Sequence, residues 1–230
     1  FDYLIAADGV FSKAKQILFK DNGLPKYFNS IALRGNIKNF DNFDISLFLG
    51  SNFHFVIYPI NQNNDFNFIS IIRKELVEKE ISSINLFEDN SFINKILNQI
   101  FSKSKINLTK QIKDIKCFPI FVSKKLQIPK IKNVFLVGDA LYSFPPSFAQ
   151  GASQSIEAAN EIFNELKNNS SNYYESRILK TKQINSRSSL NHFVFHISNP
   201  LNIFFRNFFL KYLSKNKTFL ESYLGKIYNN

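Results

Sequence analysis

The sequence offers almost no material for covalent cross-links. Its 230 residues include no methionine and no tryptophan, and Cys117 is the one cysteine. A single cysteine cannot form a disulfide within the chain, which fits a reducing compartment, and we therefore expect a cytoplasmic protein. Cys117 lies among apolar residues, which predicts an inert buried thiol.

Long apolar runs are also missing. A membrane-spanning helix needs ~18 consecutive apolar residues, and the most apolar stretch, 192–213, is interrupted by polar residues. No signal peptide is visible. Because the chain begins at Phe1 and has no methionine, we expect an N-terminally truncated piece of a longer protein, and a missing N-terminus would hide a leader.

Acidic residues are outnumbered by basic ones, 18 to 29, which gives a net charge of +11. Such a charge would ordinarily suggest nucleic acid or an anionic membrane as a partner. The lysines are spread along the chain, however, and no basic motif interleaved with aromatic residues is present. We therefore expect no nucleic-acid partner. The hydrophobic content of 44% is enough for a core in one or two domains.

The most informative stretch is 133–161, NVFLVGDALYSFPPSFAQGASQSIEAANE. An apolar strand runs into Gly138 and Asp139, a loop with two prolines follows, and a helix is expected from Gly151. A glycine lets a ligand approach the turn, and a carboxylate accepts hydrogen bonds from hydroxyl groups. The first N–H groups of a helix favour an anionic or carbonyl-bearing ligand. The buried face of this helix is predicted from apolar residues at helical spacing, namely Ile156, Ala159, Phe163 and Leu166.

A second turn of this kind lies near the start of the chain. Residues 3–7 predict a short buried strand, and Asp8 and Gly9 follow it directly as a turn signal. Ser12 and Lys15 come three and six residues after Gly9. The sequence therefore contains two apolar strands, one near its start and one at 134–137, and each is followed by a turn with one aspartate and one glycine.

Together the two turns resemble motifs of the class A FAD-dependent aromatic monooxygenases, the family of para-hydroxybenzoate and salicylate hydroxylases. Gly138-Asp139-Ala140, Pro146 and Gln150-Gly151 match the spacing of its GD motif, and Ala7-Asp8-Gly9 with Ser12 match its DG motif. The family's GxGxxG segment, expected upstream, is absent. The sequence departs from the family at Leu141 and Tyr142, which replace alanine and histidine, at Ala149, which replaces glycine, and at Lys15, which replaces arginine.

The resemblance implies FAD as cofactor and NADH or NADPH as co-substrate. It places Asp139 at the ribityl chain and Pro146 beside the isoalloxazine ring. The cofactor-binding residues that it implies are Asp8, Gly9, Gly138, Asp139, Pro146, Gln150, Gly151, Ala152 and Ser153.

Between the motifs, the β-type runs 31–37, 45–49, 53–60 and 66–73 predict an antiparallel sheet, followed by a helix around 92–100. Residues 116–120 are expected to form a strand or an extended segment, which Pro119 keeps irregular. In the run 53–60, alternation places His54 and Tyr58 on one face, ~13 Å apart along the strand. The resemblance makes both residues, with Arg34, substrate contacts; the alternative is that they are satisfied core or surface residues.

The C-terminal part predicts a long basic helix at 173–195 and an amphipathic aromatic helix at 199–213. His192 and His196 could share a helix face as metal ligands, but no acidic residue or cysteine lies near them, and we expect no metal. The aromatic helix is expected to pack on the FAD domain or on a second copy in a homodimer, and a peripheral membrane contact stays open.

The predicted fold is α/β to α+β: a partial FAD-binding Rossmann-type domain with an inserted antiparallel substrate sheet and C-terminal helices. The expected segments are 1–27 and 126–170 for the FAD domain, 28–125 for the sheet and 171–230 for the helices.

The resemblance implies hydroxylation of a small aromatic substrate with NAD(P)H and O2 through a C4a-hydroperoxyflavin, with His54 and Tyr58 as catalytic contacts. We expect this piece alone to be inactive. The alternatives are a reductase or dehydrogenase of the same fold, a divergent weak FAD binder, and a non-enzymatic basic membrane-surface protein.

Overall fold

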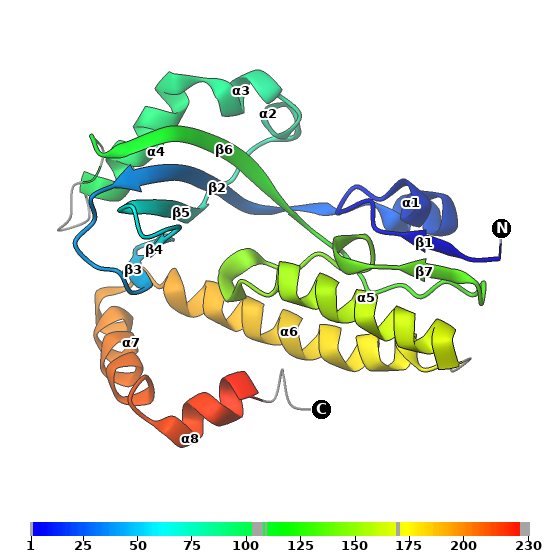
Figure 1. Cartoon of the computed structure of the whole chain (residues 1–230). Helices are drawn as coiled ribbons and strands as arrows, with labels where there is room; N and C mark the ends of the chain where they lie inside the picture. Colours follow the sequence, from blue (N-terminus) through cyan, green and yellow to red (C-terminus); the bar gives the residue numbers. More distant parts are fainter. Residues whose placement is uncertain (1, 103–107, 109, 169–170, 226–230) are drawn as a thin grey trace. The chain divides into compact units, whose positions relative to one another are not determined.

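The computed structural model describes residues 2–102, 108, 110–168 and 171–225. By its packing the chain forms two compact units, each built from separate stretches (Figure 1). Unit 1 comprises 1–28, 121–192 and 213–230, and unit 2 comprises 29–120 and 193–212. The C-terminal helices are shared between the units, because residues up to 192 and from 213 belong to unit 1 and residues 193–212 belong to unit 2.

Unit 1 is organised around two short parallel strands. Strand β1 (Leu4–Ala6) pairs with β7 (Val134–Leu136), so that Leu4 lies opposite Val134 and Ala6 opposite Leu136. The helices of this unit are α1 (Lys13–Phe19), α5 (Gly151–Asn168), α6 (Tyr173–Phe195) and α8 (Lys217–Leu220). Short helical turns occupy Lys20–Gly23, Gly138–Ala140, Pro146–Phe148 and Glu221–Gly225.

Helix α5 forms as predicted, but its predicted buried face is wrong. Ile156 and Phe163 are 72% and 62% exposed, whereas the helix buries Gln154, Ala158 and Ile162. Ala158 and Ile162 pack with Phe135 of β7, with Val137 directly after β7 and with Tyr173 of α6.

Polar contacts with α6 explain why α5 buries the side with Gln154 and Ala158. The buried Arg177 on α6 donates to Gln154, Glu157 and Glu161, which project from α5 on the same side as Ala158. A buried guanidinium must be paired, so the helix turns its acidic side inward. Figure 1 shows α5 and α6 running alongside each other.

Unit 2 contains a five-stranded antiparallel sheet in the order β3-β4-β5-β2-β6. The four predicted strands are confirmed, and the sheet gains a fifth, because the segment predicted to be irregular around Pro119 belongs to a long strand. Since β6 lies at the sheet edge, a residue without an N–H is tolerated there. The strands are β2 (Lys26–Lys38), β3 (Ser46–Gly50), β4 (Phe53–Pro59), β5 (Asp65–Arg73) and β6 (Ile112–Val122).

One face of this sheet forms the main core of unit 2. Phe55 and Phe68 are completely buried, and Phe101 of α4 (Asn90–Ser102) contacts both rings. Helices α2 (Glu78–Ile81) and α3 (Ile84–Glu88) precede α4, and α7 (Pro200–Leu213) follows α6. Cys117 is buried in this core, and burial raises the pKa of its thiol to about 12, as expected of an inert thiol. Among the described helices, none has the length and apolar character that crossing a bilayer requires.

Candidate functional site

The two aspartate turns lie side by side in unit 1. Parallel pairing brings the carboxyl ends of β1 and β7 to the same edge, and the Val137 N–H donates to the Ala6 carbonyl over 2.9 Å. Asp8 follows β1 by two residues, and Asp139 follows β7 by three. The carboxyl edge of parallel strands is where open α/β sheets bind ligands. Two turns 130 residues apart in the sequence therefore meet at a position suited to a ligand.

Asp8 has a local structural task at this edge. Its Oδ2 accepts hydrogen bonds from the N–H groups of Lys13 (2.7 Å) and Ala14 (3.3 Å) at the start of α1. Partial burial by itself would raise the pKa of Asp8, but hydrogen bonds from Ser12 and from these N–H groups bring it below the ordinary value. Asp8 is thus an ionised cap of α1. Gly9 beside it has a φ of +80° and open space where a side chain would begin.

Asp139 is different, because it has solvent access but lies in a hollow walled by protein. The partial loss of hydration raises the pKa of its carboxyl group. Gly138 before it has a φ of +59°, and a Cβ there would lie 2.4 Å from the Ser155 Oγ, so the turn requires glycine on both counts. The hollow is open to solvent, has a cavity volume of only about 20 Å³ and is lined by Gly138, Asp139, Leu141, Tyr142, Phe144, Gly151, Gln154, Ala158, Arg177 and Thr181.

The proline loop after Asp139 is held from α6. His192 Nδ1 lies 3.1 Å from the Ser147 Oγ, and Asn191 donates to the Ser147 carbonyl over 3.3 Å. The loop ends at Ala149, whose φ of +53° and ψ of +31° are left-handed. This is the position at which the resembled motif has glycine. The backbone has therefore kept a glycine conformation although the residue carries a Cβ, which adds strain.

Helix α5 begins directly after this loop. Gly151 and Ala152 are exposed, and nothing lies within 4 Å of a Cβ built on Gly151. The Ser153 hydroxyl donates to the Gln150 carbonyl over 3.2 Å. With eighteen residues, α5 presents its N–H groups and positive dipole end to the open side of the turn. This helix start suits a carbonyl-rich or anionic group.

Lys15, which replaces the arginine of the resembled DG motif, connects the two motif segments. It is 3% exposed, and its Nζ donates to the Leu141 carbonyl (2.8 Å) and lies 3.3 Å from the Ser123 Oγ. Burial lowers its pKa to about 8. Ser123 Oγ also accepts from the Ser143 N–H at 3.0 Å. The ammonium group thus ties α1 to the loop after Asp139, a link that sequence spacing alone could not reveal.

Unit 2 carries the other predicted site residues on a single face of its sheet. His54 lies opposite Ile71, Val56 opposite Ile69, and Tyr58 opposite Asn67. Arg34 is also paired with Ile69, from the other side. His54, Tyr58 and Arg34 therefore project from the face opposite to the one that packs on α4. Arg34 is exposed and its Nε lies 3.4 Å from Asn67 Oδ1, whereas Tyr58 is half-buried.

His54 has a partner that the sequence did not suggest. Its Nδ1 lies 2.8 Å from Nε2 of His196, and both rings are buried, at 4% and 1% exposure. His196 lies just beyond the end of α6, so the predicted helix face shared by His192 and His196 does not form; His192 instead contacts Ser147. Within the described residues no cluster of three or more His, Cys, Asp or Glu side chains could hold a metal ion.

Comparison with known proteins gives a uniform result for the fold. No family model matches the sequence, and no curated protein matches it. Many solved structures are similar to this chain, among them the following three. HpxO from Klebsiella pneumoniae, complexed with FAD and uric acid, has a TM-score of 0.70 and 15% identity, covering 98% of this chain and 58% of its own. A salicylate hydroxylase substrate complex has a TM-score of 0.69 and 17% identity, and the match covers 86% of this chain and 56% of the hydroxylase chain. PqsL, a probable FAD-dependent monooxygenase from Pseudomonas aeruginosa, has a TM-score of 0.62 and 15% identity, and the match covers 85% of this chain and 56% of the PqsL chain.

These similarities confirm the predicted fold: the chain is folded like class A FAD-dependent monooxygenases. The chain spans a little over half the length of the solved proteins that it resembles. At these identities the likeness concerns the architecture, and the chemistry must be argued from the chain's own residues.

Proposed function

We propose that this protein is an FAD-dependent oxidoreductase, a monooxygenase that hydroxylates a small aromatic or related ring with NAD(P)H and O2. The observation that supports this most is the meeting of the Asp8 and Asp139 turns at one edge of the parallel strands. This edge lies in a chain with the fold of FAD-dependent monooxygenases, among them proteins crystallised with FAD and with uric acid or another substrate.

The residues at this edge fit a flavin nucleotide. Gly9 and Gly151 leave open space on the ligand side, and the start of α5 would face the carbonyl-bearing pyrimidine part. Asp139 would accept hydrogen bonds from the ribityl hydroxyls, and Asp8 with Gly9 would contact the cofactor from β1. The same proposal places Gly138, Pro146, Gln150, Ala152 and Ser153 around the ring and its side chain.

FAD would supply the redox chemistry, passing electrons from NAD(P)H to O2 and one oxygen atom to the substrate. The protein must position the substrate and keep water away. We assign the substrate contact to Arg34, His54 and Tyr58, which share one sheet face. The hydrogen bond between His54 and His196 holds the imidazole ring of His54 in one orientation. We also propose a cytoplasmic location, since a chain with one cysteine cannot form an internal disulfide.

A titration of the full chain with FAD, followed by flavin fluorescence, tests the cofactor proposal. We expect saturable binding that weakens at least about tenfold in Asp139→Asn, because the amide loses the charge-assisted hydrogen bonds to the hydroxyls. Asp44→Asn is the matched control, since Asp44 lies in an exposed turn of unit 2. Absence of binding, or equal affinity of Asp139→Asn and wild type, would reject the proposal.

A flavoprotein that reduces or dehydrogenates, or a weak FAD binder, is the second candidate, and the strained Ala149 supports it. The two are separated by measuring NAD(P)H oxidation and product together over a panel of phenols and pyridines. Oxidation coupled to a hydroxylated ring supports the monooxygenase. Oxidation without hydroxylated product for any ring supports the second candidate.

A further inference from the structure

Helix α7 carries a stripe of exposed apolar side chains along its outer side. Leu201, Phe205, Phe208 and Tyr212 follow one another at steps of four, three and four residues, which places them on one helix face. Phe204 lies beside them, and its ring contacts that of Phe205. All are between 48% and 66% exposed, a large apolar surface for a single helix.

The opposite side of α7 is anchored in unit 2. Arg206 is 7% exposed, and its Nη1 donates to the Phe195 carbonyl at the end of α6 over 3.4 Å. Nε and Nη2 of Arg206 also donate to the Asn207 side chain. The preceding turn is tied to the sheet, because the Asn52 N–H donates to the His196 carbonyl over 3.3 Å. The stripe is therefore held in a fixed outward orientation.

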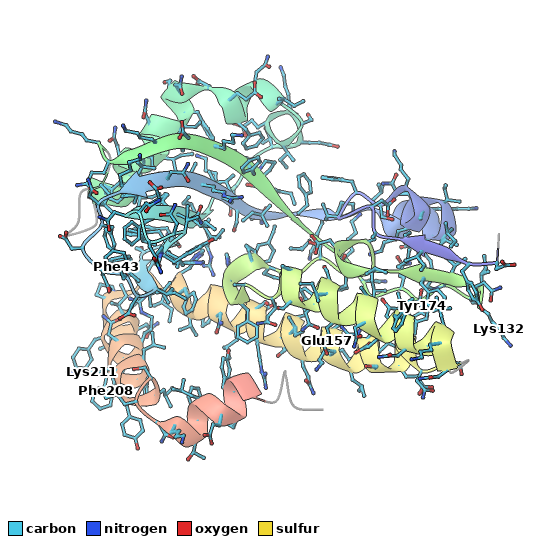
Figure 2. All side chains as sticks on the ribbon, viewed as in Figure 1. Phe43, Lys132, Glu157, Tyr174, Phe208 and Lys211 are labelled. Carbon is cyan, nitrogen blue, oxygen red and sulfur yellow. The ribbon has the colours of Figure 1, made fainter. Side chains whose placement is uncertain are left out.

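The charged residues of α7 and of the segment directly after it are basic. Lys211 lies on α7 three residues after Phe208, and Figure 2 shows the two next to each other. Lys215 and Lys217 follow in the sequence and are exposed, and Lys217 forms an ion pair with Glu221 over 3.8 Å. No acidic residue occurs between Glu175 and Glu221. An aromatic stripe with lysines and without acidic residues is the pattern of a helix that lies on an anionic membrane.

A second copy of the chain fits this surface poorly. Two identical stripes would bring the lysines of both copies together, in a protein whose net charge is already +11. Anionic headgroups instead attract the basic residues, and the phenylalanine rings enter the boundary between headgroups and acyl chains. We infer that the outer face of α7 docks the protein onto an anionic lipid surface. This inference does not depend on the proposed flavin chemistry.

Co-sedimentation of the full chain with vesicles tests the inference. The vesicles contain phosphatidylcholine with about one third phosphatidylserine, and vesicles of phosphatidylcholine alone serve for comparison. We expect binding to the anionic vesicles that falls as salt rises. The double variant Phe204→Gln/Phe208→Gln should bind at least about tenfold more weakly. Replacing Lys211 and Lys215 by glutamine should weaken binding about fivefold for each lysine.

The matched control is Phe163→Gln, which removes an equally exposed phenylalanine from α5 in unit 1. It should bind like wild type, and circular dichroism should show that every variant is folded. The inference is wrong if wild type does not sediment with anionic vesicles, or if Phe204→Gln/Phe208→Gln binds as well as Phe163→Gln. It is also wrong if analytical ultracentrifugation shows a dimer that this double variant dissociates, because a second copy then covers the stripe.

Discussion

The two sheets of this protein differ in what they contain. The five-stranded sheet of unit 2 has one large apolar core, in which phenylalanines such as Phe55, Phe66 and Phe68 are completely buried. The two-stranded sheet of unit 1 is flanked by two small clusters, and Leu4 and Ile5 of β1 are about half exposed. The larger sheet supplies most of the burial, whereas the smaller one carries the turns suited to a ligand.

The two units also differ in which residue types adopt a positive φ. The residues with positive φ in unit 2 are asparagines and one aspartate, which tolerate left-handed conformations: Asn29, Asn39, Asn52, Asn64 and Asp114. In unit 1 they include Lys20 and Ala149, for which this conformation is costly. Both units bury a cationic side chain, Lys15 in unit 1 and Arg206 in unit 2, so buried charge does not distinguish them. Strained residues of this kind cluster at sites that bind ligands, which accords with the candidate site in unit 1.

The largest predicted effect comes from the two cores. Phe68→Ala should lower the free energy of unfolding by about 3 to 5 kcal/mol, because the surrounding rings cannot close the cavity. Phe135→Ala in unit 1 should cost less, about 2 kcal/mol, since its small cluster can collapse or admit water. Denaturant midpoints measure both, with Phe163→Ala as the exposed control. An equal or larger loss for Phe135→Ala would contradict the contrast between the units.

The next prediction concerns pH. The pKa of Lys15 is lowered to about 8 in the fold, against an ordinary 10.5. Between these values the unfolded chain binds more protons than the folded one, so stability rises with pH. Relative to Lys15→Met, wild type should gain up to about 3 kcal/mol from pH 8 to 10.5.

Chemical denaturation across this pH range measures the difference. Comparing with Lys15→Met cancels the titration of tyrosines such as Tyr174, whose pKa burial raises to about 12. Parallel pH profiles of the two proteins would show that the Lys15 ammonium is not desolvated.

The smallest predicted effect tests the strain at Ala149. Ala149→Gly should raise the free energy of unfolding by about 1 kcal/mol, because glycine adopts the left-handed conformation without a steric cost. Ala152→Gly, in the first turn of α5, is the control and should lower it by roughly 0.5 to 1 kcal/mol. Thermal melts of both variants measure the signs. A loss of stability in Ala149→Gly would mean that residue 149 is not left-handed.

Much of the fold could be predicted from local patterns. Runs of β-forming residues separated by turn residues located β2 to β5, and strand–turn signals located Asp8 and Asp139. Features that depend on distant residues could not be predicted this way. The buried face of α5 follows from Arg177 on another helix, and the partner of His54 lies 142 residues away. The stretch around Pro119 was predicted to be an irregular strand or extended segment, whereas it belongs to the regular strand β6, because an edge strand tolerates a residue without an N–H.

The candidate site, too, could be predicted from the sequence only in part. Motif spacing identified the residues of the turns, but not that Asp8 caps α1 or that Lys15 ties the motifs together. The Lys15 contact joins groups that come together only when β1 and β7 pair. The Asp8 cap is local, but it depends on the exact path of the turn before α1, which spacing does not specify. Whether the sheet face with His54 and Tyr58 binds a substrate stays a prediction.

One measurement tests the central claim, that Asp139 is kept for binding a flavin and not for folding: thermal melts of wild type and Asp139→Asn with and without FAD. Because partial desolvation raises the pKa of Asp139, the uncharged amide should leave the melting temperature of the free chain unchanged or slightly higher. FAD should raise the melting temperature of wild type and have little effect on the variant. If the variant melts several degrees lower without FAD, or if FAD stabilises both proteins equally, the account is contradicted.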